Sequence, residues 1–265
     1  MQQIKNLAKQ IVPSSVKTLI KKGRYFGNSF YDPICNTPLR LLHPNGEDHP
    51  TLKEAQIVSG GYRQNSMCPV CRSRERHRLI YLYLQHHTTF FHQPQKFLYV
   101  APAPCLHTAF QQLHHLDYIS GDIDTDEREA EFDLDVTQIN YPDNTFDIIL
   151  CNHVLEHVPD DRRAMRELRR VLKPDGLAIL QVPFSPIRAE TFEDFSITSE
   201  EDRYRVFGQK DHVRIYGLDY MDRLQESGFV LDLFKWWEDD TLQEVNQGNK
   251  HGLLGNEPLF VVRKN

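Results

Sequence analysis

Two histidines, His153 and His212, lie at positions where an imidazole could accept a proton from a bound molecule. Asn152 and His153 come directly after the apolar run 146–151, and His212 lies in the long segment 184–217. Imidazole has an unperturbed pKa of about 6.5, so a histidine can take up a proton near neutral pH. We expect His212, and after it His153, to act as a base or to orient an acceptor, with Arg214 clamping an acidic group. The alternative for His212 is a hydrogen bond that ties the segment down.

Aspartates end two other apolar runs. Asp122 follows the run 118–121, and Asp135 lies near the end of the run 132–136. A carboxylate about 20 residues beyond a first strand can accept both hydroxyls of a ribose. The first turn, residues 101–105, contains no glycine, although a dinucleotide needs glycines there so that backbone can approach its pyrophosphate. The pattern favours a nucleoside cofactor without phosphate; the alternative for each aspartate alone is a solvated strand end.

A cysteine pair, Cys68 and Cys71, is separated by two residues and forms a knuckle whose thiolates can bind one metal ion. The tripeptide 33–35 repeats the pattern Pro-x-Cys, but Asp32 stands where the first cysteine would be. Asp32, Cys35, Cys68 and Cys71 would form a zinc site with one oxygen ligand. His43 or His49 could replace the aspartate. The alternative is a metal-free knuckle with its cysteines buried as small apolar groups.

Cations are dense in two places. The stretch 72–78 contains Arg76 among four arginines, and it could hold a carboxylate or phosphate of a substrate. Its alternative is pairing with Glu75 and with acidic loops. Residues 1–24 contain lysines and an arginine, no acidic residue, and apolar residues at helical spacing. Such a helix can contact an anionic membrane peripherally, or it can pack on its own protein.

Strand and helix alternate from about residue 95 onward, which predicts a doubly wound α/β sheet of seven strands. We expect strands at 96–101, 118–121, 132–136, 146–151, 177–182, 229–235 and 259–263, with helices at 106–115, 161–172 and 218–227. The predicted organisation is a basic amphipathic helical segment (1–30), a cysteine-knuckle or zinc-ribbon-like module (31–72), a connecting helix (73–94) and a ligand-binding domain (95–265).

Composition narrows the class of protein. The 265 residues have a formal net charge of −6, which disfavours a nucleic-acid binder. No apolar run approaches the roughly 20 residues of a spanning helix, and no signal-peptide core is evident. Five cysteines need no disulfide in a chain of this size. We expect a cytoplasmic location, with peripheral membrane contact through residues 1–24 as a further option.

Several motifs together resemble one known family. They are the block 152–159, the turn 171–176, the segment 31–71, the tetrapeptide 75–78 and the segment 207–214. Together they are similar to class I S-adenosylmethionine-dependent methyltransferases of the type 11 kind, in a bacterial subgroup with an N-terminal cysteine knuckle. The resemblance implies a Rossmann-like sheet and S-adenosylmethionine bound by Ala101, Pro102, Asp122, Ile123, Asp135, Val136 and Asn152. Asp32, Ala103 and Asp175 depart from the family pattern.

The resemblance implies transfer of a methyl group to an oxygen or nitrogen of a small-molecule or glycan-type acceptor. The reaction needs alignment of the acceptor and exclusion of water, and it needs a base only when the acceptor is a hydroxyl or a protonated amine. Ala103 and the incomplete knuckle leave one alternative, a degenerate methyltransferase fold that binds without turnover. A nucleotide-dependent oxidoreductase is disfavoured by the glycine-free turn.

Overall fold

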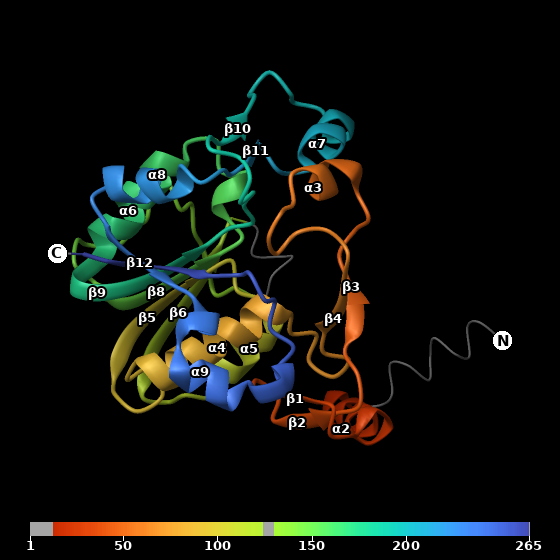
Figure 1. Cartoon of the computed structure of the whole chain (residues 1–265). Helices are drawn as coiled ribbons and strands as arrows, with labels where there is room; N and C mark the ends of the chain where they lie inside the picture. The colour runs from red at the N-terminus through yellow and green to blue at the C-terminus, as the bar shows by residue number, and fades with distance from the viewer. Residues whose placement is uncertain (1–12, 124–129, 265) are drawn as a thin grey trace.

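The computed structural model describes residues 13–123 and 130–264. A seven-stranded sheet in the order β12-β13-β9-β8-β5-β6-β7 is its centre (Figure 1). The strands β5 to β9 are parallel, whereas β13 runs antiparallel to both β9 and β12. Their bounds are Gln95–Val100 (β5), Leu116–Asp122 (β6), Phe132–Asp133 (β7), Phe146–Asn152 (β8), Leu172–Gln181 (β9), Val230–Phe234 (β12) and Leu259–Arg263 (β13).

Helices cover both faces of this sheet. Successive side chains of a strand point to opposite faces, so Leu98 and Val100 of β5 join one apolar cluster while Phe97 and Tyr99 join the other. The first cluster is closed by α6 (Asp161–Val171) and α8 (Tyr220–Glu226), and the second by α4 (Glu75–His87), α5 (Pro104–Phe110) and α9 (Asp240–Val245).

The remaining elements lie beside the sheet. The N-terminal part contains α2 (Ser14–Tyr25), α3 (Pro50–Glu54) and two antiparallel hairpins, β1 (Phe30–Asp32) with β2 (Thr37–Leu39) and β3 (His43–Asn45) with β4 (Arg63–Met67). The segment between β9 and α8 carries β10 (Phe192–Glu193), α7 (Glu200–Phe207) and β11 (Arg214–Ile215). Short 3-10 turns occupy Leu155–His157, Trp236–Glu238 and Gln247–Asn249.

The strand and helix predictions agree with this architecture in order and type, but several elements differ in length. The strand predicted at 177–182 begins at Leu172, and the helix predicted at 73–94 covers only Glu75–His87. The predicted third strand ends early, since β7 pairs with β6 through only two residues. The helix predicted at 106–115 begins at Pro104, whose fixed φ suits the first helical position, and ends at Phe110.

The N-terminal helix α2 turns its apolar side outward. Val16, Leu19 and Ile20 are exposed, and Tyr25 packs inward against the cysteine knuckle. Residues 1–12 of the predicted amphipathic segment lie outside the described residues, so membrane contact stays a prediction. None of the helices in the described part of the chain is long and apolar enough to cross a bilayer.

Arg78 joins the N-terminal part to the sheet domain. Its guanidinium is fully buried and donates to the carbonyls of Ser66, Ser73, His251 and Gly252 at 2.5–3.0 Å. These carbonyls come from the knuckle and from the segment before β13. A single side chain therefore satisfies backbone groups from segments that are far apart in the sequence.

Replacing Arg78 tests this link. Arg78→Met keeps the length of the side chain but leaves four buried carbonyls without a donor, so we expect the free energy of unfolding to fall by about 3–5 kcal/mol. Urea unfolding measures this change. Arg166→Met, on the exposed side of α6, is the matched control and should change stability by less than about 0.5 kcal/mol. Equal effects of the two substitutions would contradict the role given to Arg78.

Candidate active site

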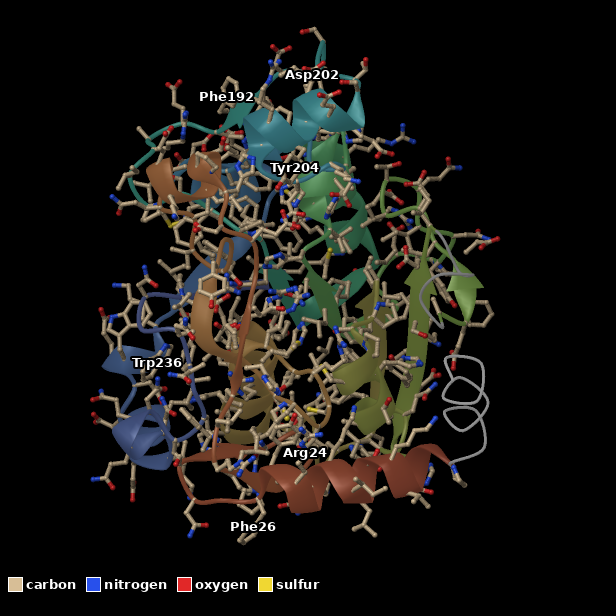
Figure 2. All side chains as sticks on the ribbon, turned by 90° about the vertical axis from the view of Figure 1, so that its right-hand side faces the viewer. Arg24, Phe26, Phe192, Asp202, Tyr204 and Trp236 are labelled. Carbon is tan, nitrogen blue, oxygen red and sulfur yellow. The ribbon has the colours of Figure 1, made fainter. Side chains whose placement is uncertain are left out.

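A cavity of about 790 Å³ lies at the carboxyl edge of β5, β8 and β9, the edge where open α/β sheets bind ligands. It is enclosed by the loop after β5, the loop after β8, the N-terminal part and the segment 184–217. Figure 2 views the molecule from the N-terminal side, with Phe192, Asp202 and Tyr204 above and Arg24 and Phe26 below. Of the predicted residues, Ala101, Pro102, Arg76, Asn152, His153, His212 and Arg214 line this cavity.

Two neighbouring strands end in left-handed residues at the cavity. Ala101 after β5 has φ +50° and His153 after β8 has φ +57°. A side chain with a Cβ in this conformation costs about 1–2 kcal/mol. Both residues are fixed by backbone hydrogen bonds, Ala101 N to Gly121 O and His153 N to Gln181 O, each 2.8 Å. Such maintained strain typically marks a ligand-binding edge.

A buried carboxylate follows this edge. Glu156 is 1% exposed, and neither of its oxygens has a hydrogen-bond partner among the described residues. The Nδ1 of His153 lies 3.3 Å from Glu156 Oε1, and the Nε2 of His153 is also buried without a described partner. Burial raises the pKa of Glu156 and lowers the pKa of His153, since both lose water around their charged forms. The histidine is therefore neutral at ordinary pH.

His212 comes to the same place from the segment after β9. Its ring lies 4.8 Å from the ring of His157, nearly perpendicular to it. Burial, followed by the nearby His157, lowers the pKa of His212 to about 3, so His212 is neutral and can accept a proton. A backbone bond from Val213 N to Glu156 O, 3.0 Å long, joins the two loops beside these side chains.

The opposite side of the cavity is basic. Arg76 is 6% exposed, and its Nε has no hydrogen-bond partner among the described residues. Burial and then the neighbouring Arg74 lower the pKa of Arg76 to about 10, so it remains charged. Glu75, the expected partner of this cluster, is instead paired with Arg63, which donates from Nε at 2.9 Å. Glu75 is thus paired with an arginine outside the cluster of residues 72–78, and no bond from Arg76 to Glu75 is present among the described residues.

The guanidinium of Arg214 is bound by groups of the protein itself. It is 1% exposed, and its guanidinium donates to Glu193 Oε2 and to the carbonyls of Leu155, Val158 and Pro159 at 2.5–2.9 Å. These contacts occupy its donors within the protein. Arg214 therefore holds the loop after β8 in place, and its role as a clamp for an acidic acceptor stays a prediction.

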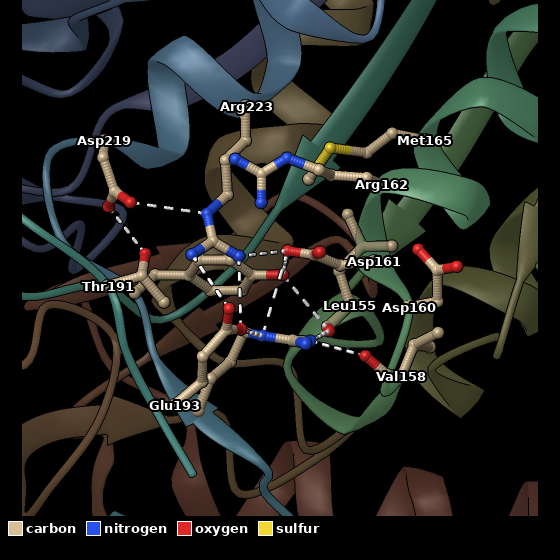
Figure 3. Close-up of polar contacts among 12 residues, drawn as sticks. Leu155, Val158, Asp160, Asp161, Arg162, Met165, Thr191, Glu193, Asp219 and Arg223 are labelled. Carbon is tan, nitrogen blue, oxygen red and sulfur yellow. Dashed lines mark hydrogen bonds and ion pairs between the residues drawn. The ribbon is translucent and has the colours of Figure 1, made fainter. Parts of the chain in front are cut away.

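Figure 3 shows the network around this arginine. Asp161 accepts from Tyr216 Oη at 2.8 Å and from Arg223 Nη1 at 3.0 Å, while Glu193 pairs with both Arg214 and Arg223. Asp219 also pairs with Arg223, at 3.4 Å, so three carboxylates surround the two buried guanidiniums. Buried charges are tolerated when they are paired in this way. The network connects the segment 184–217 to the start of α6.

The predicted cofactor contacts beyond β5 lie at neighbouring strand ends. Asp122 is the last residue of β6 and is 7% exposed, whereas Ile123 after it is exposed. Asp135 lies two residues beyond β7 and accepts from the backbone and hydroxyl of Thr137 through Oδ1. Val136 is buried. None of these four is among the described residues that line the cavity, so they would extend the site along the sheet edge.

The cysteine knuckle converges as predicted. One ligand atom each from Asp32, Cys35, Cys68 and Cys71 lies within 4.8 Å of the others. The sulfurs of Cys35 and Cys68 are 3.9 Å apart, and Cys71 Sγ lies 3.5 Å from Asp32 Oδ2. Tetrahedral zinc with Zn–S of about 2.3 Å and Zn–O of about 2.0 Å requires edges of roughly 3.8 and 3.5 Å. The donor set therefore fits zinc.

His49, which could have replaced Asp32 as a zinc ligand, makes other contacts. His49 Nδ1 accepts from Thr51 N at 3.2 Å, and its ring meets Tyr204 edge-on. Asp32 Oδ1 accepts from the backbones of Ile34 and Cys35, while Oδ2 accepts from the Ser73 hydroxyl and faces the Cys71 thiol. Burial raises the pKa of Asp32, and hydrogen bonds from the thiols of Cys35 and Cys71 lower the pKa of Cys68.

Sequence reasoning missed Glu156 and Glu257. Glu156 stands inside the conspicuous block 152–159, but no role was assigned to it from the sequence. Glu257 is buried with both oxygens lacking a hydrogen bond to described residues, and burial raises its pKa to about 7. No sequence signal could have shown that Glu257, near the end of the chain, is buried near the arginines of residues 63–76.

Glu257 should make stability depend on pH. The folded state keeps its proton up to about pH 7, whereas the unfolded chain loses it near 4.5, so Glu257 lowers stability increasingly as pH rises between these values. We expect Glu257→Gln to stabilise the protein, with an advantage that grows by roughly 2 kcal/mol from pH 5.5 to pH 8. Urea unfolding at the two pH values measures this. Exposed Glu244→Gln is the control; an unchanged pH trend in Glu257→Gln would refute the assignment.

Part of the chain is similar in sequence to known proteins. Residues 100–180, from the end of β5 to the end of β9, match the family described as a methyltransferase domain. An uncharacterized protein from Methanocaldococcus jannaschii is 40% identical over 72 residues, 26% of this chain and 32% of its own length. A ubiquinone/menaquinone biosynthesis C-methyltransferase from Cellvibrio japonicus is 28% identical over 109 residues, 36% of this chain and 44% of its own length. The chain thus spans less than half the length of these relatives.

Solved structures of other proteins align with most of this chain. The YcgJ protein from Bacillus subtilis aligns with a TM-score of 0.47 and 18% identity, covering 71% of this chain and 99% of that one. The 1,6-didemethyltoxoflavin-N1-methyltransferase from Burkholderia thailandensis aligns with a TM-score of 0.44 and 14% identity, covering 70% and 76%. The sequence match at residues 100–180 covers less than half of the chain and shows that this part is similar to a methyltransferase domain.

Proposed function

We propose that the protein transfers a methyl group from S-adenosylmethionine to an oxygen or nitrogen of an acceptor that carries an anionic group. Small molecules and glycan-type compounds fall within this class. The observation that carries the proposal is that a neutral, largely buried His153 and a buried, charged Arg76 line one cavity, at the edge of the part of the chain that matches a methyltransferase domain.

Histidines of the cavity could supply the proton acceptor that methyl transfer to a hydroxyl or a protonated amine requires. A bond forms between the acceptor atom and the methyl carbon, the bond from that carbon to sulfur breaks, and the sulfonium becomes the neutral thioether of S-adenosylhomocysteine. A hydroxyl or protonated amine must also lose a proton. His153 Nε2 and the ring of His212 are the candidate proton acceptors, because burial keeps both histidines neutral.

The cofactor would lie along the strand ends. Asp122 would accept the ribose hydroxyls, Asp135 and Val136 would border the adenine, and Ile123 would cover it. Ala101, Pro102 and Asn152 would approach the methionine part, because they lie at the carboxyl ends of β5 and β8. Asn152 Oδ1 is buried without a hydrogen bond to described residues, which suits a donor from the ligand.

Arg76 favours an anionic acceptor. A guanidinium desolvated to this extent is stabilised by an opposite charge, and a carboxylate or phosphate offers two oxygens to its planar donors. Substrate recognition by Arg76 was predicted from its sequence neighbourhood, and the cavity supports it. The degenerate-module alternative rests on the incomplete knuckle and on Ala103, because an alanine supplies no acidic side chain at that point of the loop. The backbone N of Ala103 donates to Tyr99 Oη at 3.0 Å.

We further propose a structural zinc ion on Asp32, Cys35, Cys68 and Cys71. The ion would neutralise a buried carboxylate and thiols, and it would join the β1–β2 hairpin to the knuckle before α4. Because α4 begins four residues after Cys71 and carries Arg76, the metal would fix the direction in which the arginine enters the cavity.

Cofactor binding is the first test. Asp122→Ala removes the proposed ribose contact, so we expect the affinity for S-adenosylhomocysteine, measured by calorimetry, to fall at least tenfold with thermal stability retained. Asp117→Ala, on the same strand at an exposed position, is the control and should bind like the parent. No heat from the parent protein at millimolar ligand would exclude the proposed function.

The acceptor is the second test. Methyl transfer from labelled S-adenosylmethionine is measured on paired acceptors with and without a carboxylate or phosphate. We expect activity on the anionic members, and Arg76→Gln should lose it at least tenfold while binding of S-adenosylhomocysteine persists. Cofactor binding without transfer to any acceptor would favour the degenerate module, and equal use of neutral acceptors would refute the role of Arg76.

Zinc is the third test. Elemental analysis of the purified protein should find zinc that is lost in Cys68→Ser, with a lowered midpoint of thermal unfolding. Cys151→Ala, a buried cysteine of β8 outside the cluster, should keep the metal. Full zinc retention in Cys68→Ser would contradict the assigned ligands.

A further inference from the structure

A second group of potential metal ligands faces the acidic end of the cavity. One ligand atom each from Glu156, His157 and His212 lies within 4.8 Å of the other two. The three residues come from two loops, the one after β8 and the segment before β11. They share no residue with the cysteine cluster, and the methyl-transfer chemistry described above gives His157 no role.

The tautomer of His157 is set by a neighbour. Its Nδ1 lies 3.3 Å from both the carbonyl and the carboxylate Oδ2 of Asp211, so Nδ1 carries the hydrogen. In the neutral ring the lone pair is then on Nε2, which lies 3.9 Å from Glu156 Oε1. A histidine held by a carboxylate on one nitrogen, with the other nitrogen free to coordinate, is the usual arrangement around protein-bound metals.

The separation of these two atoms also suits a shared ion. At 3.9 Å, Nε2 of His157 and Oε1 of Glu156 are too far apart for a hydrogen bond, and two lone-pair atoms facing each other would repel. Two ligands on one ion at about 2.1 Å each can lie up to roughly 4 Å apart. Glu156, with both oxygens lacking a described hydrogen-bond partner, supplies the negative charge.

We propose that Glu156, His157 and His212 bind a first-row divalent cation that holds the acceptor's reacting oxygen or nitrogen. Two imidazoles and one carboxylate select such a cation over Mg²⁺ and leave coordination positions open. The cation would lower the pKa of a bound hydroxyl. His212 would then be a ligand, and His153 would remain the proton acceptor. The role at the acceptor rests on the proposed function, whereas the site itself does not.

Manganese is a suitable probe, because it is a harder ion than zinc and competes poorly for thiolates. The protein is freed of exchangeable metal with a chelator and titrated with Mn²⁺, and the loss of the free-ion electron paramagnetic resonance signal is measured. We expect one Mn²⁺ per chain, retained in excess Mg²⁺, with nitrogen couplings from imidazole in pulsed spectra. Absence of binding, or binding without nitrogen couplings, would overturn the proposal.

Variants locate the ion. Glu156→Gln and His157→Gln are each expected to weaken Mn²⁺ binding at least tenfold, whereas His86→Gln, an exposed histidine of α4, should bind as the parent does. Unchanged binding in Glu156→Gln would overturn the site. The zinc content and the melting temperature of each variant show whether it is folded.

S-adenosylhomocysteine binding separates the two hypotheses. If Mn²⁺ binds as expected but S-adenosylhomocysteine does not, the proposed function fails and the metal site stands. If S-adenosylhomocysteine binds and Mn²⁺ does not, the metal site fails and the proposed function stands.

Discussion

The cavity depends on one buried ion-pair network. Arg214 and Arg223 pair with three carboxylates, those of Asp161, Glu193 and Asp219. Arg214 also holds three carbonyls of the loop that contains Glu156 and His157. That loop has few backbone bonds of its own, since it is a single 3-10 turn between β8 and α6. The guanidinium thus replaces regular secondary structure, and the bond from Val213 to Glu156 aligns His212 beside it.

The cavity has one acidic end and one basic end outside this ion-pair network. The carboxylates and arginines of the network pair with one another. What remains is an acidic end at Glu156 and a basic end at Arg76, each buried and incompletely satisfied by the described residues. Uncompensated burial of charge costs several kcal/mol unless a ligand balances it. A molecule with an anionic group and a coordinating oxygen or nitrogen would satisfy both ends.

The sequence predicted the fold well because the parallel strands are nearly continuous apolar runs. In β8, for example, the run at 146–151 ended at the cavity with Asn152 and His153, as expected. Strand ends were therefore predictable, and so was the convergence of Cys35 with the knuckle 33 residues away. The contacts of Arg214 were not predictable, because the sequence of a polar motif does not show whether an arginine donates to a ligand or to backbone carbonyls.

Buried carboxylates were equally hidden, and for a related reason. Acidic residues are normally solvated, so Glu156 and Glu257 could be distinguished from surface residues only by the tertiary packing that removes their water. The same packing gives them their chemical value, because a carboxylate that water cannot reach must gain a proton, a cation or a ligand. The segment 184–217 supplies that packing for Glu156 through His212 and Val213, which makes an insertion in the sheet fold the element that completes the site.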